Sequence, residues 1–155
     1  MASWLTEVVR LESPVHIDEV GRRIADAAGV GRIGRLIRES LLEATRFAAR
    51  SGSLRIDGNF LWWPDMDQPS PRNREDLKNT SKKLELVDLN EISAAAFVVV
   101  AGARGIRREE LPAPTVRILG FAKVTENMRI RVGLAIDKMI VEQRIEEQGG
   151  LIVVS

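Results

Sequence analysis

Cysteine is absent from the sequence, and histidine occurs once, as His16. Without thiols the chain can form no disulfide and has no thiolate nucleophile. A zinc site of the usual Cys/His kind is excluded for the same reason. No phosphate-binding loop and no pairing of a nucleophile with a base takes their place. We therefore predict that the chain is not an enzyme, with no catalytic residue, no cofactor and no metal ion, and that His16 has a structural role.

Long apolar runs are missing as well. None approaches the roughly 18 residues that a transmembrane helix needs. The first residues, MASWLTEVVRLE, do not have the pattern of a signal peptide. We expect no membrane partner and a cytoplasmic location.

The composition that remains is that of an ordinary folded protein, with 45% apolar and 29% charged residues. The formal net charge is only +1. A charge this small does not indicate any class of partner, so a basic surface can arise only where arginines gather on one face.

The chain repeats itself. Val15–Trp62 can be laid over Ile106–Val153 without a gap, at a constant offset of 91 residues. The overlay matches a helical stripe, turn glycines and a terminal strand in a single register, which indicates an internal duplication. The matched pairs include Ile37 with Met128, Leu41 with Val132, Ala44 with Ala135, Ala48 with Met139, Gly58 with Gly149, and Leu61 with Ile152.

The two copies are separated by a polar segment, Pro64–Lys83. It is rich in proline, aspartate, asparagine and serine and has almost no apolar residues, a composition typical of a linker. We therefore predict a first domain over residues 1–63, a linker over 64–86 and a second domain over 87–155.

Each copy has the pattern of a helix, a short strand, two more helices and a β-hairpin. In the first copy, acidic Asp18 and Glu19 begin the second helix and Gly29 ends it. Apolar residues at 37, 41, 44 and 48 predict one buried stripe on the third helix. Asp57-Gly58 and Gly149-Gly150 predict the hairpin turns. The expected helices include residues 4–11, 34–50, 91–101 and 125–142.

This order of elements predicts a mainly α fold with small β-hairpins (α+β), made of two tandem winged helix-turn-helix domains. The overlay is uneven at its start. Asp88-Leu89-Asn90 introduces the first helix of the second copy, and the matching positions fall before Met1. The first helix of the first copy is therefore expected to be short, and the chain to be a piece of a larger protein.

The stretch GVGRIG, Gly29 to Gly34, has the G-x-G-x-x-G spacing of a dinucleotide-binding loop. That loop must follow a buried strand and open a helix. Here the preceding VGRRIADAA is amphipathic with a helical period, and the second copy keeps only the first glycine. We interpret GVGRIG as the turn between the second and third helices.

Arginines gather on the third helix and beside it. With Ile37 at zero on a helical wheel, Arg38, Arg35 and Arg46 lie at about 100°, 160° and 180°, on the outward face. The third helix of a winged domain enters the major groove, where arginine binds guanine edges or phosphates. Solvated surface arginines paired with Glu39 and Glu43 are the alternative. The predicted nucleic-acid contacts are Arg32, Arg35, Arg38, Arg46 and Arg55, the last on the hairpin.

The second copy departs from this pattern. Glu126 and Asp137 lie on its outward helical face, and acidic groups there would repel phosphates. Ile130 and Leu134 lie close by. If exposed, they predict a protein interface; burial against the first copy is the alternative.

Several runs resemble a known family. They are ESPVHIDEVGRRIADAAGVGRIGRLIRESLLEATRFAARSG, GNFLW, PRNR, LELVDLNEISAAAFVVV and GIRREELPAPTVRILGFAKVTENMRIRVGLAIDKMI. Together they resemble a bacterial domain of unknown function found at the C-terminus of large superfamily 1 helicase-like proteins, often fused to an endonuclease-like domain. The resemblance covers nearly the whole chain, although GFAKVTENMRIR departs from the expected Gly/Arg turn. It implies an accessory module of a DNA-processing protein, with no catalytic residues in this region.

The predicted function is non-catalytic binding of duplex or branched DNA by a helicase-associated module. The alternative is a protein-interaction or structural module that packs on neighbouring domains of the larger protein or self-associates as a homodimer.

Overall fold

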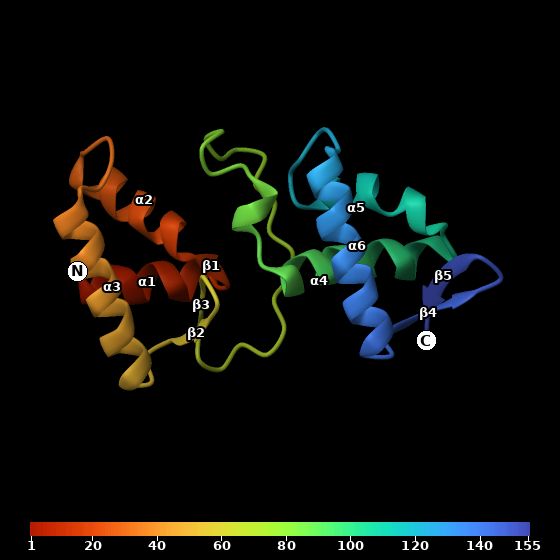
Figure 1. The fold of residues 1–155 in the computed structure, drawn as a ribbon, viewed down its shortest axis with the longest axis horizontal. Helices are drawn as coiled ribbons and strands as arrows, with labels where there is room; N and C mark the ends of the chain where they lie inside the picture. The colour runs from red at the N-terminus through yellow and green to blue at the C-terminus, as the bar shows by residue number, and fades with distance from the viewer. The chain divides into compact units, whose positions relative to one another are not determined.

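The computed structural model describes residues 1–155, and its chain forms two compact units, Met1–Asp67 and Gln68–Ser155 (Figure 1). Six α-helices are accompanied by two small antiparallel sheets, so the predicted α+β class is confirmed. None of the helices combines the length and the apolar character needed to cross a lipid bilayer.

Unit 1 begins with a helix and ends with a hairpin. Its elements are α1 (Ala2–Glu12), β1 (Val15–His16), α2 (Ile17–Ala28), α3 (Arg35–Arg50), β2 (Arg55–Asp57) and β3 (Phe60–Trp62). Helix α1 is longer than the predicted 4–11, while α3 agrees with the predicted 34–50 to within one residue.

Helix α2 has both of its expected end signals. The side chain of His16 caps its start by accepting a hydrogen bond from the main-chain N–H of Asp18, which confirms a structural role for His16. Gly29 ends it with φ 71°, a left-handed conformation that favours glycine. The stretch that follows leads directly into α3, so GVGRIG is a turn between two helices as predicted.

Strand β3 is the centre of a three-stranded sheet in the order β1-β3-β2. Val15 pairs with Leu61 on one side of it, and Ile56 pairs with Leu61 on the other. Gly58, with φ 59°, supplies the tight turn between β2 and β3 that the sequence predicts.

The core of unit 1 differs from prediction on α3. Leu41 and Ala48 are buried, and Ala44 packs against the core. Ile37, at the start of the predicted stripe, is 38% exposed. The stripe is continued inward by Thr45, whose hydroxyl donates to the carbonyl of Leu41 and is thereby satisfied inside the helix.

Unit 2 contains the remaining elements. They are η1 (Leu84–Leu86), α4 (Leu89–Ala103), η2 (Arg108–Glu110), α5 (Pro112–Ile118), α6 (Glu126–Val141), β4 (Ile145–Gln148) and β5 (Leu151–Val154). An isolated bridge joins Ile106 to Ile152. The core is a single cluster to which α4, α5, α6 and the hairpin all contribute.

The two units share a register of element boundaries. At the offset of 91, α3 falls on α6 with both ends matched. The pair Val15–Leu61 in unit 1 falls on the bridged pair Ile106–Ile152 in unit 2. The turn glycines also coincide, with φ 59° at Gly58 and 57° at Gly149.

The predicted linker over residues 64–86 differs most from the structure. The division between the units falls at Asp67, and Arg72–Val87 is folded against unit 2. Arg74 and Leu84 are buried within it, and Arg74 is ion-paired to Glu91 of α4. We call Arg72–Val87 the cap segment. Its polar composition is typical of a linker, but the contacts that hold it against unit 2 are made with residues far along the chain, such as Glu91.

Candidate nucleic-acid interface

The outward face of α3 is basic. The helix carries four arginines and two glutamates, and all six side chains belong to exposed residues. The predicted Arg35, Arg38 and Arg46 are joined by a fourth, Arg50, which the prediction missed. Arg50 lies at about 220° on the same wheel, one turn beyond Arg46, so the helical period could have revealed it.

Two of these arginines have acidic neighbours. The Nε of Arg35 lies 3.6 Å from an Oε1 of Glu39, one turn away, with most of the arginine side chain in solvent. The guanidinium of Arg38 donates to Oδ1 of Asp18 at 2.9 Å, which links α3 to the first turn of α2. Exposed pairs of this kind are worth little, so a phosphate can replace either carboxylate at small cost.

Two others have no ion-pair partner. Arg32 lies in the turn between α2 and α3, and Arg46 lies on the outward face of α3. Both residues are exposed, and neither makes a side-chain hydrogen bond or salt bridge. They are the two predicted contacts whose charge is exposed to solvent and is not neutralised by an acidic partner.

Arg55 is held by its own unit. It sits on β2, where its guanidinium stacks on the ring of Trp62 at 4.7 Å and donates to the main-chain carbonyl of Met66 at 3.0 Å. A cation held on an aromatic face keeps its charge but loses freedom to reach a backbone. The structure therefore brings Arg32, Arg35, Arg38 and Arg46 together on or beside α3, and sets Arg55 apart on the sheet.

Apolar side chains lie among these arginines. Leu36, Leu42 and Phe47 are exposed on α3. Leu42 falls at about 140° on the wheel, between Arg38 and Arg35. Leu36 and Phe47 fall at about 260° and 280°, beside Arg50. An apolar group next to cations gives a face that can contact both phosphates and the apolar parts of bases or sugars.

The same positions of unit 2 carry different chemistry. Under the shared register the five predicted arginines fall on Lys123, Glu126, Arg129, Asp137 and Glu146. Three of the five are acidic. Asp137 is engaged by Arg108, whose guanidinium donates to it at 2.6 Å and also to the carbonyl of Gly133. Helix α6 therefore does not present a basic face.

The outward face of α6 is apolar instead. Ile130 is 55% exposed, Leu134 is 52% exposed and Val141 is 82% exposed. They follow one another at helical spacing, at about 200°, 240° and 220° when Met128 is taken as zero. Ile130 and Leu134, the two residues of the predicted protein interface, are thus not buried within unit 2 itself.

No group of three or more histidine, aspartate or glutamate side chains is arranged to hold a metal ion. His16 lies on β1 of the sheet of unit 1, and burial lowers its pKa while Asp18 and Glu19 act in the opposite direction. It accepts a hydrogen bond through Nδ1 and contacts Phe60 edge-on. In this arrangement His16 caps the start of α2.

Comparison with known proteins gives one match. Residues 1–39, which include α1, β1, α2 and the start of α3, match the model of a family described as "Protein of unknown function (DUF3320)". The match supports the resemblance to a domain of unknown function over this part of the chain. Searches of curated proteins and of solved structures gave no match.

Proposed function

We propose that this chain is a non-catalytic DNA-binding module built of two winged helix-turn-helix units. In this proposal, α3 of unit 1 contacts the DNA. The observation that carries the proposal is the outward face of α3, where Arg35, Arg38, Arg46 and Arg50 are exposed together. Arg32 in the preceding turn extends this basic face toward the start of the helix.

The order of elements supports the proposal. In a winged helix-turn-helix domain the third helix occupies the major groove, and the turn before it approaches the phosphate backbone. In unit 1 the third helix is α3, the turn is GVGRIG, and the hairpin of β2 and β3 stands in the position of the wing. The arginines lie on the elements that would need them, which is the reason to favour DNA over a general surface role.

The context we propose is a larger DNA-processing protein of the helicase type, in which this module positions a helicase or nuclease on duplex or branched DNA. The resemblance of the sequence to domains carried by superfamily 1 helicase-like proteins supports this context. Most of the affinity would come from phosphate contacts, so binding should weaken steeply as salt rises.

The test is an anisotropy titration of the full chain with duplex, forked and single-stranded DNA at two salt concentrations. The double variant Arg35→Glu and Arg38→Glu should abolish binding to every DNA that the unmodified chain binds. The double variant Arg10→Glu and Arg107→Glu is a control with the same change in charge, because both arginines are also exposed and ion-paired but lie outside α3. Unchanged affinity of the double variant, or equal loss with the control, would overturn the assignment of α3.

Single variants can sort the contacts. Arg46→Ala should weaken binding to all sequences and reduce the salt dependence by about one counterion. Arg55→Ala should change binding little, because its guanidinium is occupied by Trp62 and Met66. A loss at Arg55 as large as that at Arg46 would show that the hairpin contributes.

The second candidate function is protein interaction through unit 2. It is favoured by the exposed Ile130, Leu134 and Val141 on α6, where unit 1 has charged residues. Such a patch fits a neighbouring domain of the larger protein or a second copy of this chain. Light scattering after size-exclusion chromatography tests self-association, which Leu134→Glu should abolish without affecting DNA binding by α3.

A further inference from the structure

The cap segment closes one end of the helical bundle of unit 2. The main-chain N–H of Arg74 donates to the carbonyl of Leu119 at 3.0 Å, where α5 ends. At the other end of the segment, the guanidinium of Arg131 on α6 donates to the carbonyl of Val87 at 2.6 Å. The segment is therefore fastened to α5 and to α6, in addition to the ion pair of Arg74 with α4.

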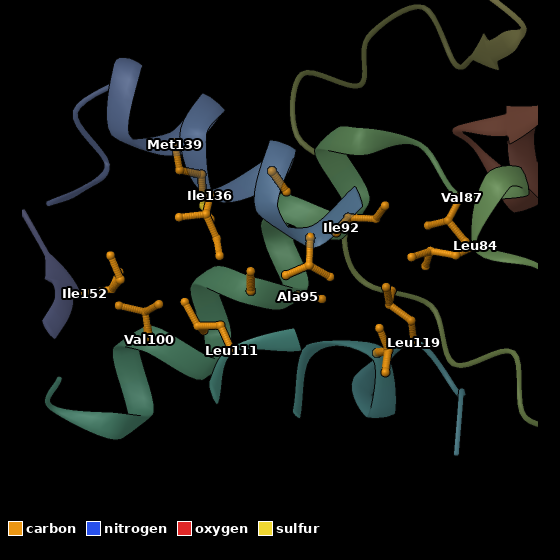
Figure 2. Close-up of a cluster of buried hydrophobic side chains, with 14 of the residues drawn as sticks. Leu84, Val87, Ile92, Ala95, Val100, Leu111, Leu119, Ile136, Met139 and Ile152 are labelled. Carbon is orange, nitrogen blue, oxygen red and sulfur yellow. The ribbon is translucent and has the colours of Figure 1, made fainter. Parts of the chain in front are cut away.

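The cap segment also supplies apolar side chains to the core. Leu84 and Val87 belong to the same buried cluster as Ile92 and Leu119, as Figure 2 shows. Contact with the bundle is close, because a Cβ built on Gly120 would lie within 2.6 Å of the cap segment. The N-terminal end of α4 and the C-terminal end of α5 are thus covered by a piece of chain made of turns and the 3-10 helix η1.

The equivalent end of unit 1 has no such cover. We call the residues concerned the open end: Met1, Trp4, Ala28, Val30 and Ile37. All five are exposed, with Met1 at 46% and Trp4 at 49%. In the shared register their counterparts are Ile92, Ala95, Leu119, Phe121 and Met128. The first four of these are buried and the fifth packs against them, in the cluster that contains Leu84 and Val87.

The geometry points to the open end of unit 1 as a docking site for a polypeptide segment that carries a leucine and a valine three residues apart, on one 3-10 turn such as η1. The assignment rests on the difference between the two units at the same end of the fold. Unit 2 shows what covers this end of the fold, and its cover is a segment of that chemistry. In unit 1 the start of α1 and the end of α2 lie at one side of the bundle (Figure 1), and both contribute apolar residues there.

The two ends differ in one anchoring contact. Arg131, which binds the carbonyl of Val87 in unit 2, corresponds to Ser40 in unit 1. Serine cannot reach and charge-assist a carbonyl as arginine does, so the docked segment in unit 1 is held mainly by its apolar side chains. Docking at the open end is independent of the DNA-binding proposal, because none of its residues is an arginine of α3.

The experiment adds to unit 1 a copy of the cap segment, at the position along the chain that the cap segment has in unit 2. A second copy of residues 72–91 is fused directly before Met1 of the full chain, because Met1 corresponds to Ile92. Trp4 reports the result, since its ring lies at the open end while Trp62 is already buried. A chain with Trp4→Phe supplies the emission of the other two tryptophans for subtraction. The expected outcome is a blue shift of Trp4 emission, loss of its quenching by acrylamide, and slower hydrogen exchange at the end of α2.

The matched control carries Asp in place of Leu84 and Val87 in the added copy alone. It has the same length and the same polar residues, so protection of Trp4 in this control would mean that tethering and not the apolar pair is responsible. Trp4 is larger than its counterpart Ala95, so the fusion is also made with Leu84→Ala in the added copy to relieve a clash. If neither fusion protects Trp4 more than the control does, the docking assignment is wrong.

Two further outcomes decide the occupant. Adding Ser40→Arg to the fusion should increase protection of the end of α2, because it restores the anchor to the carbonyl of Val87. Protection of Trp4 in the unfused chain that rises with protein concentration would show that a second copy covers the open end, and would overturn the assignment to a segment of this chemistry.

Discussion

The guanidinium of Arg74 and the carboxylate of Glu91 form a bidentate ion pair, with N···O distances of 2.7 and 2.8 Å, in the interior of unit 2. Both side chains are almost completely removed from solvent. Glu91 also accepts from the main-chain N–H of Arg72 at 2.9 Å. A buried carboxylate with three donors is satisfied, and it ties the cap segment to the first turn of α4.

Loss of Arg74 should therefore destabilise unit 2 strongly. Arg74→Ala leaves the Glu91 carboxylate buried without its counter-charge, a change that typically costs about 3–5 kcal/mol. The double variant with Glu91→Ala should lose less than the sum of the two single losses, because no charge is then left unpaired. Chemical denaturation followed by far-UV circular dichroism gives the free energies of unfolding.

All three tryptophans lie in unit 1. Their fluorescence separates a local effect of Arg74→Ala from a general one: hydrogen exchange should accelerate in unit 2 while the tryptophan transition is retained. Additive losses in the double variant would contradict the coupling between Arg74 and Glu91.

Gly29 and Gly120 occupy the same place in the two units, and their substitution should have unequal effects. Gly29→Ala introduces only the strain of φ 71°, about 1–2 kcal/mol, because no atom lies within 4 Å of the added Cβ. Gly120→Ala adds to similar strain a contact at 2.4 Å with the main-chain nitrogen of Glu75. The cap segment must then move, and the loss should exceed about 4 kcal/mol.

Thermal unfolding of the two glycine variants, measured side by side, tests this difference. Equal losses would mean that the cap segment does not press on Gly120 in solution. The pair also separates the effect of the cap segment from that of the helix end, because both glycines have a positive φ and donate to the last turn of a helix, to the carbonyls of Asp26 and Arg117.

The local signals of the sequence were sufficient for the helices and turns. The end of α2 at Gly29 and the turn at Gly58 follow from conformations that only glycine adopts readily. The start of α2 was also predictable, since acidic residues in a first turn interact favourably with the positive end of the helix dipole. The glycines that end helices and form turns recur at an offset of 91 residues, which is why the two units can be aligned from the sequence.

The cap segment could not be predicted in the same way. Its composition is polar, and Arg74 finds its partner 17 positions along the chain. A helical wheel likewise places Arg38 on the outward face of α3, but it does not show that Arg38 forms an ion pair with Asp18 of α2. Ile37 illustrates the limit for burial: the period places it on the inner stripe, but the structure leaves it partly exposed at the open end.

His16 should make the stability of unit 1 depend on pH. Burial lowers its pKa below the ordinary 6.5, and its neutral Nδ1 accepts the N–H of Asp18. Protonation removes that acceptor. Because the folded-state pKa is the lower one, the stabilisation is complete above about pH 6.5 and is lost as the pH falls toward the folded-state value.

The measurement is urea denaturation followed by tryptophan fluorescence, at about pH 7.5 and about pH 5, on either side of the ordinary histidine pKa. His16→Asn supplies a capping side chain that does not titrate. The unmodified chain should lose more stability than this variant on acidification. Equal losses would assign the pH dependence to the carboxylates alone.

Asp18 should restrain DNA binding by the proposed interface. Its carboxylate holds the guanidinium of Arg38 at 2.9 Å and places a negative charge beside the basic face of α3. Asp18→Asn removes both effects. An exposed pair is worth up to about 1 kcal/mol, so affinity for duplex DNA should rise by up to roughly fivefold at low salt.

Glu7→Gln is the control for Asp18→Asn, because it removes the same charge from an exposed ion pair with Arg10 on α1. The gain from Asp18→Asn should disappear when Arg38 is also replaced by alanine, since the freed guanidinium is its source. An equal gain from Glu7→Gln would instead attribute the effect to net charge and remove Arg38 from the contact surface. Titration of all four chains at one ionic strength separates these results, because screening by salt would otherwise mimic the loss.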